Sequence, residues 1–363
     1  MMLLVYSEYR IMIPGSRHAI RTYKRAREFA VQYERWFMPA MLVAGTAFDV
    51  WQFKVLDLRE KFILMCVYVA VVMGSMISAT YKQSEASSRL RYIRLVAPFA
   101  QQFAMGGLLS TALLFYWFSG DVAVTWPIVT LVAFLMISNE TLRHIVLRPL
   151  VQVGILSFAL FSLCAIWFAH LFHSLSWPVF LAGGFTSMVV MTGLLTLLIR
   201  LGDLYKDRMR MWTVMAGVFA FMNVCYFFNI IPPIPLALRD ATMAYSIADD
   251  FTLSAPEESW LDQLIPGQEI LLTPGNALYA YTAIYAPEDV SAIIVHVWER
   301  YDEDQKNWVA EHRLTFTIIG GRSDGYRGYS MVSSLAAGKW RVSVETVSGQ
   351  VLGRIGFSIV TGR

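Results

Sequence analysis

The sequence predicts a polytopic α-helical membrane bundle of about seven transmembrane helices, followed by an antiparallel β-sandwich of the immunoglobulin-like kind. First, 56% of the 363 residues are hydrophobic and only 16% are charged, whereas a soluble domain carries roughly 25% charged residues. Second, long apolar runs fill residues 36–235, and short alternating runs fill residues 236–363. Third, the first 235 residues carry 20 Lys and Arg against 11 Asp and Glu, but the remainder carries 10 against 16. These observations exclude a single soluble globule and a disordered chain.

Composition divides the chain into three predicted parts. Residues 1–35 are basic and are expected in the cytoplasm or at the interface, because Arg17–Arg35 has the pattern of an amphipathic helix on a lipid surface. Residues 36–235 form the predicted transmembrane domain, and residues 236–363 form the predicted extracytoplasmic β domain. The three cysteines all lie in the apolar part, which excludes a disulfide scaffold.

Each predicted span is an apolar run of roughly 20 residues, the length that an α-helix needs to cross a bilayer core of about 30 Å. The first is the weakest because it contains Asp49. The seventh ends before Pro232 and Pro233, which cannot continue a helix. In chain order, the spans are 36–53, 62–81, 96–119, 122–138, 150–173, 177–199 and 212–231.

Basic residues predict the orientation of these spans. Four alternate segments, 1–35, 82–95, 139–149 and 200–211, hold 17 Lys and Arg, whereas the intervening loops hold three. Loops rich in Lys and Arg remain in the cytoplasm. The N-terminus is therefore expected inside, and seven crossings would place the acidic tail outside. This expectation depends on the first span crossing despite Asp49.

The tail alternates in the manner of β-strands, with Val, Ile, Thr and Tyr runs between Gly, Pro and Asp clusters. Hairpin turns are expected at Pro274–Asn276 and at Ser348–Gly349. Ile294, His296 and Trp298 are expected to share one strand face. The predicted strands cover 242–248, 268–273, 278–285, 291–299, 307–319, 326–333, 339–346 and 350–360.

Several strings resemble a bacterial family of domains of unknown function, the one numbered 2914. In the tail these are YAYTAIYAP, HVWER, GGRSDGYRGYS and GKWRVSVETVSGQVLGRIGFSIV, and in the apolar part GTAFDVWQFKVLD, QQFAMGGLLSTALLFYWFSG, ISNETLR and NIIPPIPLALRD. The resemblance implies a multi-pass protein of the bacterial inner membrane with a periplasmic β domain. It implies no activity and no catalytic residue.

Polar residues within membrane spans are functional candidates. Glu140, His144 and Arg148 have the i, i+4, i+8 spacing that would place them on one helical face, where they would bind an anionic head group or relay a proton. Gln102 is expected at the same end of the bundle, and Asp49 near the opposite end of the first span. The alternative for this polar cluster is local salt-bridging at the interface.

In the tail, a Gly-rich turn carries Arg322, Tyr326 and Arg327. Arginine binds carboxylate or phosphate bidentately, and an aromatic ring offers a stacking face. The turn is therefore a candidate binding site for a glycan, a lipid head group or a peptide carboxylate. His296 and Trp298 are expected beneath it. The alternative is a structural hairpin whose arginines satisfy local groups.

No nucleophile-elbow, Walker, H-E-x-x-H or C-x-x-C motif is present, so no catalytic residue, metal or cofactor is predicted. The acidic tail does not suit nucleic acid. The expected function is a non-enzymatic envelope protein, held in the lipid bilayer, whose β domain binds a glycan, lipid or protein partner. Transport or flipping of a lipid-linked or small anionic substrate is the first alternative, and an intramembrane lipid-modifying enzyme is the second. Assembly as a homo-oligomer is left open.

Overall fold

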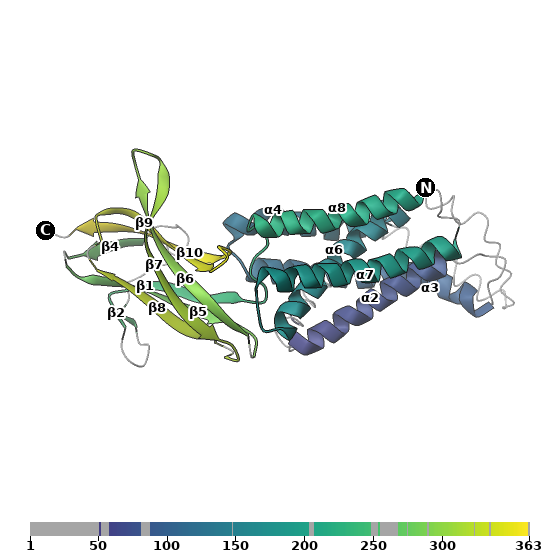
Figure 1. Ribbon diagram of the computed structural model, residues 1–363, viewed down its shortest axis with the longest axis horizontal. Coiled ribbons are helices and arrows are strands. Elements are labelled where there is room, and N and C mark those ends of the chain that lie inside the picture. Colours follow the sequence, from purple (N-terminus) through teal and green to yellow (C-terminus); the bar gives the residue numbers. More distant parts are fainter. Residues whose placement is uncertain are drawn as a thin grey trace, which may run out of the picture. The chain divides into compact units, whose positions relative to one another are not determined.

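A computed structural model describes most of the chain after residue 50 (Figure 1). The described residues are 51, 58–80, 88–146, 148–202, 207–247, 253–254, 268–273, 275–288, 290–322, 324–333 and 335–361. The predicted basic segment 1–35 and most of the first predicted span, including Asp49, lie outside these residues.

Within the described residues, six helices of 20 or more residues and one short helix precede all the strands. Their positions follow the second to seventh predicted spans. They are α2 (Leu58–Thr80), α3 (Ser88–Phe118), α4 (Val122–Thr141), the short α5 (Arg143–Val146), α6 (Pro149–Leu171), α7 (Trp177–Leu201) and α8 (Arg208–Phe227).

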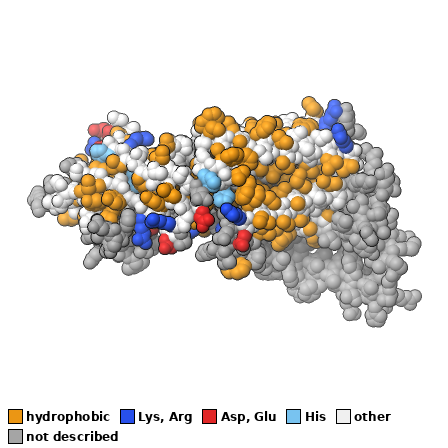
Figure 2. Space-filling view, turned by 60° about the horizontal axis from the view of Figure 1, so that its bottom comes forward, with side chains coloured by type: hydrophobic (Ala, Val, Ile, Leu, Met, Phe, Trp, Pro, Cys, Tyr) orange, Lys and Arg blue, Asp and Glu red, His pale blue; other side chains and the backbone are white. Residues whose placement is uncertain are grey.

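The expectation of about seven transmembrane helices is not met by the described residues. Four of their helices, α2, α4, α6 and α7, are long and apolar enough to cross a membrane by length and composition. The remaining two long helices are more polar: Gln101 and Gln102 lie within α3, and Arg208 and Arg210 begin α8. Hydrophobic side chains nevertheless cover much of the helical surface seen in Figure 2.

Helix α6 is the central helix of the bundle. It is the most buried of the four candidate spans, and it packs against α7 and α8. Close approach to α7 depends on small residues, because a Cβ atom on Gly183 would lie 2.9 Å from the Cys164 carbonyl oxygen. A Cβ on Gly184 would similarly meet the Phe161 ring. The sequence therefore allows these two helices to approach at a pair of glycines.

Strands β1–β10 follow, and eight of them form two sheets that share a core. The three-stranded sheet has the order β1-β5-β8, and the five-stranded sheet has the order β4-β10-β9-β6-β7. Their bounds are β1 (Ala237–Ala244), β4 (Gln268–Leu272), β5 (Ala277–Tyr285), β6 (Ser291–Asp302), β7 (Asn307–Ile319), β8 (Tyr326–Ser333), β9 (Gly338–Thr346) and β10 (Val351–Thr361). A small hairpin pairs β2 (Ser246–Ile247) with β3 (Leu253–Ser254).

The antiparallel prediction holds for every pairing among these strands except one. Strand β4 pairs parallel with β10. The hairpin expected at Pro274–Asn276 was therefore wrong: the turn carries the chain from β4 in one sheet to β5 in the other. The turn at Ser348–Gly349 does join an antiparallel pair, β9 and β10, and Gly349 has a φ of 84° that suits glycine.

Both sheets contribute inward side chains to the core between them. Met243, Leu278 and Val332 come from the three-stranded sheet, whereas Trp298 and Trp340 come from the five-stranded sheet. The expected face of β6 is confirmed, because Ile294, His296 and Trp298 are fully buried. Large side chains at alternate positions thus determine which face of each strand is internal.

Polar contacts connect the strands to the helices. The Asp121 carboxylate caps α4 by accepting from the Ala123 amide, and it forms an ion pair with Arg354 of β10 at 3.2 Å. The Gln350 Nε2 donates to the Ile231 carbonyl at 3.0 Å. These polar contacts fix the β9–β10 turn against the ends of α4 and α8.

Candidate functional site

The strongest candidate site lies on the outward face of the three-stranded sheet. The strand register aligns its outward side chains in rows: Asp240 and Arg327 flank Ala283, Thr242 and Tyr329 flank Tyr281, and Ala244 and Met331 flank Tyr279. We call this surface the tyrosine face. It comprises Asp240, Thr242, Ala244, Tyr279, Tyr281, Ala283, Tyr285, Arg327, Tyr329 and Met331, with Arg239 above Tyr285.

Aromatic side chains dominate one end of the tyrosine face. The rings of Tyr279 and Tyr329 lie 5.9 Å apart between centroids, in a tilted arrangement. Tyr329 is 49% exposed and Met331 is 50% exposed, although both belong to a sheet whose opposite side is buried. Tyrosine combines a flat apolar ring with a polar hydroxyl, which makes this end suitable for recognition.

Arginine side chains gather at the other end. Arg239 lies over the Tyr285 ring at 5.2 Å, and Arg322 lies over the Tyr326 ring at 5.4 Å. Arg327 is exposed in the row of Ala283. The predicted trio is therefore divided: Arg322 lies over Tyr326, which faces inward opposite Ile284, whereas Arg327 lies on the tyrosine face.

These arginines differ from those of the five-stranded sheet. Among the described residues, Arg239, Arg322 and Arg327 form no ion pair with a carboxylate. By contrast, three of the four guanidiniums of the other sheet are matched by protein carboxylates: Arg300 by Glu311, Arg341 by Glu299 and Arg354 by Asp121. The tyrosine face thus carries positive charge that the described part of the domain does not neutralise.

Tyr281, at the centre of the tyrosine face, is influenced by charged residues on both neighbouring strands. Burial raises the pKa of the Tyr281 hydroxyl; Arg327 opposes that rise and Asp240 adds to it. The opposing effects place Tyr281 within the fields of both charged residues that flank Ala283. Tyr281 is only 6% exposed and Ala283 only 4%, so the exposed side chains of the face are those of the flanking strands: Asp240, Arg327, Tyr329 and Met331.

The Gly-rich turn before β8 is fixed in place rather than loosely attached. The Gly321 amide donates to the Ala286 carbonyl at 3.1 Å, and the Gly320 amide donates to the Val290 carbonyl at 3.0 Å. A Cβ on Gly320 would overlap the Pro287 carbonyl, so only glycine fits there. Gly325 has a φ of 90°, which other residues rarely adopt. These glycines place Arg322 beside Tyr326.

His296 and Trp298 lie on the inward side, beneath the sheet, and are fully buried. The Trp298 Nε1 donates to the Ser330 Oγ at 3.0 Å, and that oxygen lies 2.8 Å from the His296 Nδ1. The His296 Nε2 lies 3.1 Å from the Thr282 Oγ1, whose hydroxyl donates to the Gly328 carbonyl at 3.4 Å. Both predicted side chains therefore support the tyrosine face from below.

The hydrogen-bond directions specify the state of the imidazole. Because the Thr282 hydroxyl proton is donated to a carbonyl, the Thr282 oxygen accepts from the His296 Nε2–H. The Nδ1 then accepts from the Ser330 hydroxyl, which in turn accepts from Trp298. Burial lowers the pKa of His296 to about 4. The imidazole is thus neutral at pH 7, and the side-chain polar groups of Trp298, Ser330, His296 and Thr282 all have hydrogen-bond partners.

Sequence reasoning missed most of the tyrosine face. Tyr279, Tyr281 and Tyr285 were visible only as part of a string that resembles a family, and Tyr329 followed the arginine turn without a role. The signal was present: three tyrosines at even spacing in YAYTAIY must lie on one face of a strand. What the sequence lacked was the β5–β8 register that brings Tyr329 beside Tyr281.

A second charged network, also missed, covers the outward face of the five-stranded sheet. Arg341 holds Glu299 through two hydrogen bonds of 2.6 and 3.0 Å, and Ser343 donates to the same carboxylate at 2.8 Å. Burial alone would raise the pKa of Glu299, but the bonds from Arg341 and Ser343 outweigh it and lower the pKa. Glu345 has a raised pKa from burial and from nearby Glu299. The network is internally satisfied and is therefore a structural element of the domain.

The predicted polar cluster of the bundle does not lie on one helix. Glu140 is near the end of α4, His144 lies in α5, and Arg148 is the extended residue before α6. The single-face arrangement was therefore wrong: α4 ends at Thr141, between Glu140 and His144, and Pro149 disfavours helical geometry at Arg148. The side chains of Glu140 and His144, like Asp49, lie outside the described residues. Gln102 binds Asn139 instead, through reciprocal bonds between side-chain amides and backbone carbonyls of 3.0 and 3.1 Å.

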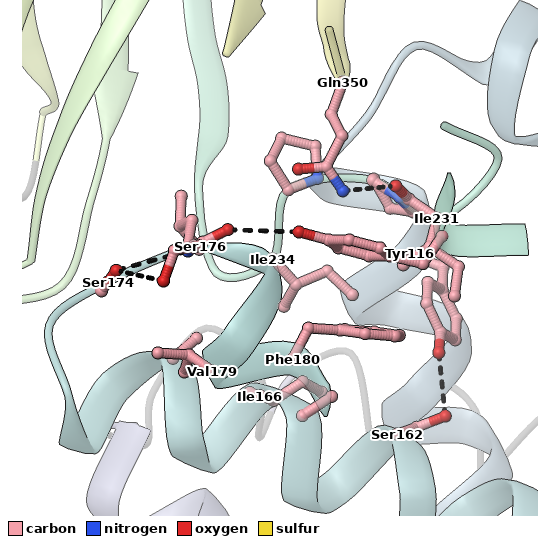
Figure 3. Close-up of a pocket in the computed structure, with 16 residues that line it drawn as sticks. Tyr116, Ser162, Ile166, Ser174, Ser176, Val179, Phe180, Ile231, Ile234 and Gln350 are labelled. Carbon is pink, nitrogen blue, oxygen red and sulfur yellow. Dashed lines mark hydrogen bonds between the residues drawn. The ribbon is translucent and has the colours of Figure 1, made fainter. Parts of the chain in front are cut away.

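A small cavity of about 40 Å³ lies among the ends of α3, α6, α7 and α8 (Figure 3). Its lining is mostly apolar, with the stacked rings of Phe180 and Tyr226 and the segment Ile231–Ile234. The Tyr116 hydroxyl is 2.8 Å from the Ser162 hydroxyl within it. A cavity of this volume has room for only a few water molecules. It does not include Gln102 or Arg148.

No group of His, Cys, Asp and Glu in the described residues could hold a metal ion. His170 and His173 lie at the end of α6 with ring centroids 6.4 Å apart. Their neighbourhood supplies no third ligand among those residues.

Comparison with known proteins identifies one family. Residues 292–359 match a family described as "Protein of unknown function (DUF2914)". The match covers strands β6 to β10 and part of their core, so the C-terminal resemblance is confirmed there. Among curated proteins, none matches this chain.

Among solved structures, one match to this chain is the Pseudomonas fluorescens alkylpurine DNA glycosylase AlkC bound to DNA containing an abasic site analog. It shares 10% identity over 82% of this chain and 98% of that chain, with a TM-score of 0.22. A likeness at that TM-score carries no argument about fold or function.

Proposed function

We propose that this protein is a non-enzymatic component of a bacterial inner membrane whose helices anchor the β domain in the periplasm, where the tyrosine face binds an envelope partner. The exposed apolar side chains of the helices support the anchor: Ile63, Phe103, Phe134 and Phe185 are each more than 60% exposed. Such side chains are stable in lipid and costly in water.

One observation carries the binding proposal: among the described residues, Arg239 and Arg327 have no carboxylate partner, and they border a sheet face on which Tyr329 is exposed and Tyr279 is half-buried. Unmatched guanidiniums and exposed aromatic rings are the groups most often used as anchors in recognition. The buried chain from Trp298 to Thr282 fixes the two strands that carry these groups, so the face is preorganised.

Transport of a lipid-linked or small anionic substrate remains the second candidate. Its support is the hydrogen-bonded pair of the half-buried Gln102 and the buried Asn139 in α3 and α4. The larger polar cluster on which it depended is divided among α4, α5 and the start of α6. The tyrosine face therefore gives the stronger proposal.

The binding proposal is tested with the full-length protein in detergent micelles, sedimented with washed bacterial envelope fragments. We expect Arg327→Ala and Tyr329→Ala each to reduce the co-sedimented fraction at least about fivefold. Arg313→Ala is the matched control, because Arg313 is an exposed arginine on β7, in the opposite sheet. Equal sedimentation of all three variants and the wild type would reject the tyrosine face as the binding surface.

A further inference from the structure

Segments at one end of the helical bundle contact the β domain. Between α3 and α4, the Asp121 amide donates to the Val351 carbonyl of β10 at 3.2 Å. Between α6 and α7, Leu175 packs against one of the two apolar core clusters of the strands. After α8, the Ile231 carbonyl accepts the bond from Gln350. The strands are therefore held against the ends of several helices.

Exposed aromatic side chains surround these contacts on the helices. Trp117 and Trp126 flank Asp121 in the chain, and they are 48% and 59% exposed. Trp177 begins α7 and Phe228 follows α8, with exposed fractions of 58% and 73%. Tryptophan is enriched at the boundary between lipid and water. In a membrane-spanning bundle, these rings would place the head-group layer level with the strand contacts.

The β domain exposes three apolar side chains at the same level. Ile293, Ile319 and Val347 are 50%, 61% and 69% exposed, and we call them the apolar corner. The strand register brings together the start of β6, the end of β7 and the end of β9. Val347 precedes Gly349 by two residues, and a Cβ on Gly349 would lie 3.2 Å from the Asn229 side chain beyond α8. The corner thus lies close to the end of α8.

The segments that form the apolar corner carry no charged residue. Residues 291–297, 314–321 and 346–352 contain no Asp, Glu, Lys or Arg. At the other end of the β6–β7 hairpin, six of the eight residues 299–306 are charged. Exposed apolar side chains that adjoin one another are typical of interaction surfaces. Because this corner is uncharged and lies level with the aromatic rings of the helices, a lipid surface is the partner that fits it best.

We propose that the apolar corner enters the head-group layer of the bilayer, so that lipid covers the side chains of Ile293, Ile319 and Val347. The inference rests on the proposed membrane anchor and adds a second contact, made by the β domain itself. Burial of these side chains in lipid removes apolar surface from water. The corner and the helix contacts together orient the β domain, with the charged tip of the β6–β7 hairpin roughly 30 Å further along the strand.

The test uses the full-length protein in lipid nanodiscs, with the photoreactive residue benzoylphenylalanine in place of Ile319 or Val347. Lipid adducts formed on irradiation are counted by mass spectrometry of the intact protein. Leu271 is the matched control site, because it is 65% exposed and pairs with Val360 near the far end of β10. We expect adduct yields at Ile319 and Val347 at least about tenfold above the yield at Leu271. The same probe at Phe134, which is 61% exposed on α4, reports whether the helices lie in lipid.

A charge placed in the corner gives a second measurement. Val347→Asp should lower the adduct yield of the Ile319 probe at least about fivefold, because a carboxylate opposes entry into lipid. Leu271→Asp should leave that yield unchanged. An Ile319 yield that Val347→Asp does not alter would contradict the proposal.

The probe on the helices separates this inference from the proposed anchor. If Phe134 forms lipid adducts while Ile319 and Val347 yield no more than Leu271, the apolar corner lies outside the lipid and the inference is wrong, although the anchor stands. A protein cross-linked to the Val347 probe in native membranes, in place of lipid, would also overturn it. The absence of adducts at Phe134 as well would reject both the anchor and the inference.

Discussion

His296 shows how a single buried residue supports the proposed site. Its ring connects Ser330 of β8 to Thr282 of β5, directly beneath the row that contains Tyr281 and Tyr329. A neutral imidazole satisfies both hydroxyls, whereas a protonated ring would carry an uncompensated charge into a fully buried position. Burial therefore makes the stability of the β domain dependent on pH.

We expect the free energy of unfolding to fall as the pH falls. Burial lowers the folded pKa of His296 to about 4, below the ordinary value near 6.5, so the unfolded chain binds more protons between these values. The stabilising contribution is complete above about pH 6.5 and is lost on acidification towards pH 4. By pH 5 the loss should reach about 2 kcal/mol.

Thermal unfolding of the full-length protein in detergent between pH 7.5 and pH 5 measures this effect. His296→Gln should be less stable at pH 7.5 but should lose less stability on acidification than the wild type. His312→Gln serves as the control, because His312 is exposed on β7, and it should follow the wild type. An unchanged slope in His296→Gln would show that another group causes the pH dependence.

At the scale of elements, the contact between α6 and α7 depends on the absence of a side chain. A Cβ on Gly183 would lie 2.9–3.0 Å from backbone atoms of Cys164 and Ala165, which cannot rotate away. A Cβ on Gly193, nearly three turns further along α7, would meet nothing within 4 Å. The same substitution therefore has opposite expected effects at the two positions.

Gly183→Ala should force the helices apart and lower the free energy of unfolding by about 1–3 kcal/mol. Gly193→Ala should leave it unchanged or raise it by up to about 1 kcal/mol, because alanine favours the helix. Thermal unfolding in detergent compares the two variants. If Gly183→Ala were as stable as Gly193→Ala, the close helix contact would be disproved.

Sequence patterns located most elements because their signals are local. Seven of the eight predicted strands coincide closely with observed ones, since alternation and turn residues are properties of short segments, whereas the predicted strand 242–248 overlaps only the end of β1. The pairing of strands was harder to predict from the sequence: nothing in Gln268–Leu272 reveals that this strand pairs parallel with β10. In the bundle, the assumed continuous face of Glu140, His144 and Arg148 ignored the break before Pro149, although that proline was visible.

The candidate site was only partly predictable for the same reason. Glycines, Arg322, Tyr326 and Arg327 are contiguous and could be found as one turn. The tyrosine face combines residues from three strands, so it required the register. That Arg239 and Arg327 have no carboxylate partner in the described part of the chain is likewise a property of the tertiary structure, and no sequence pattern reveals it.

At the scale of the whole molecule, a basic, apolar helical part is joined to an acidic β domain. The ion pair of Asp121 with Arg354 and the bond from Gln350 to the Ile231 carbonyl connect the two within the described residues. A binding role in the envelope further requires that the β domain lie outside the cytoplasm. Loop charges predict that sidedness, and it depends on an odd number of crossings.

The most direct measurement of this central claim is a fusion of alkaline phosphatase after Arg363, since that enzyme is active only when exported. The account predicts strong phosphatase activity in intact cells, and no fluorescence from a green fluorescent protein fused at the same position and routed through the same export path. A matched fusion within residues 139–149 should give the reverse pattern. If the phosphatase fused after Arg363 were inactive and the green fluorescent protein fused there were fluorescent, the β domain would lie in the cytoplasm, which would contradict the envelope-binding role.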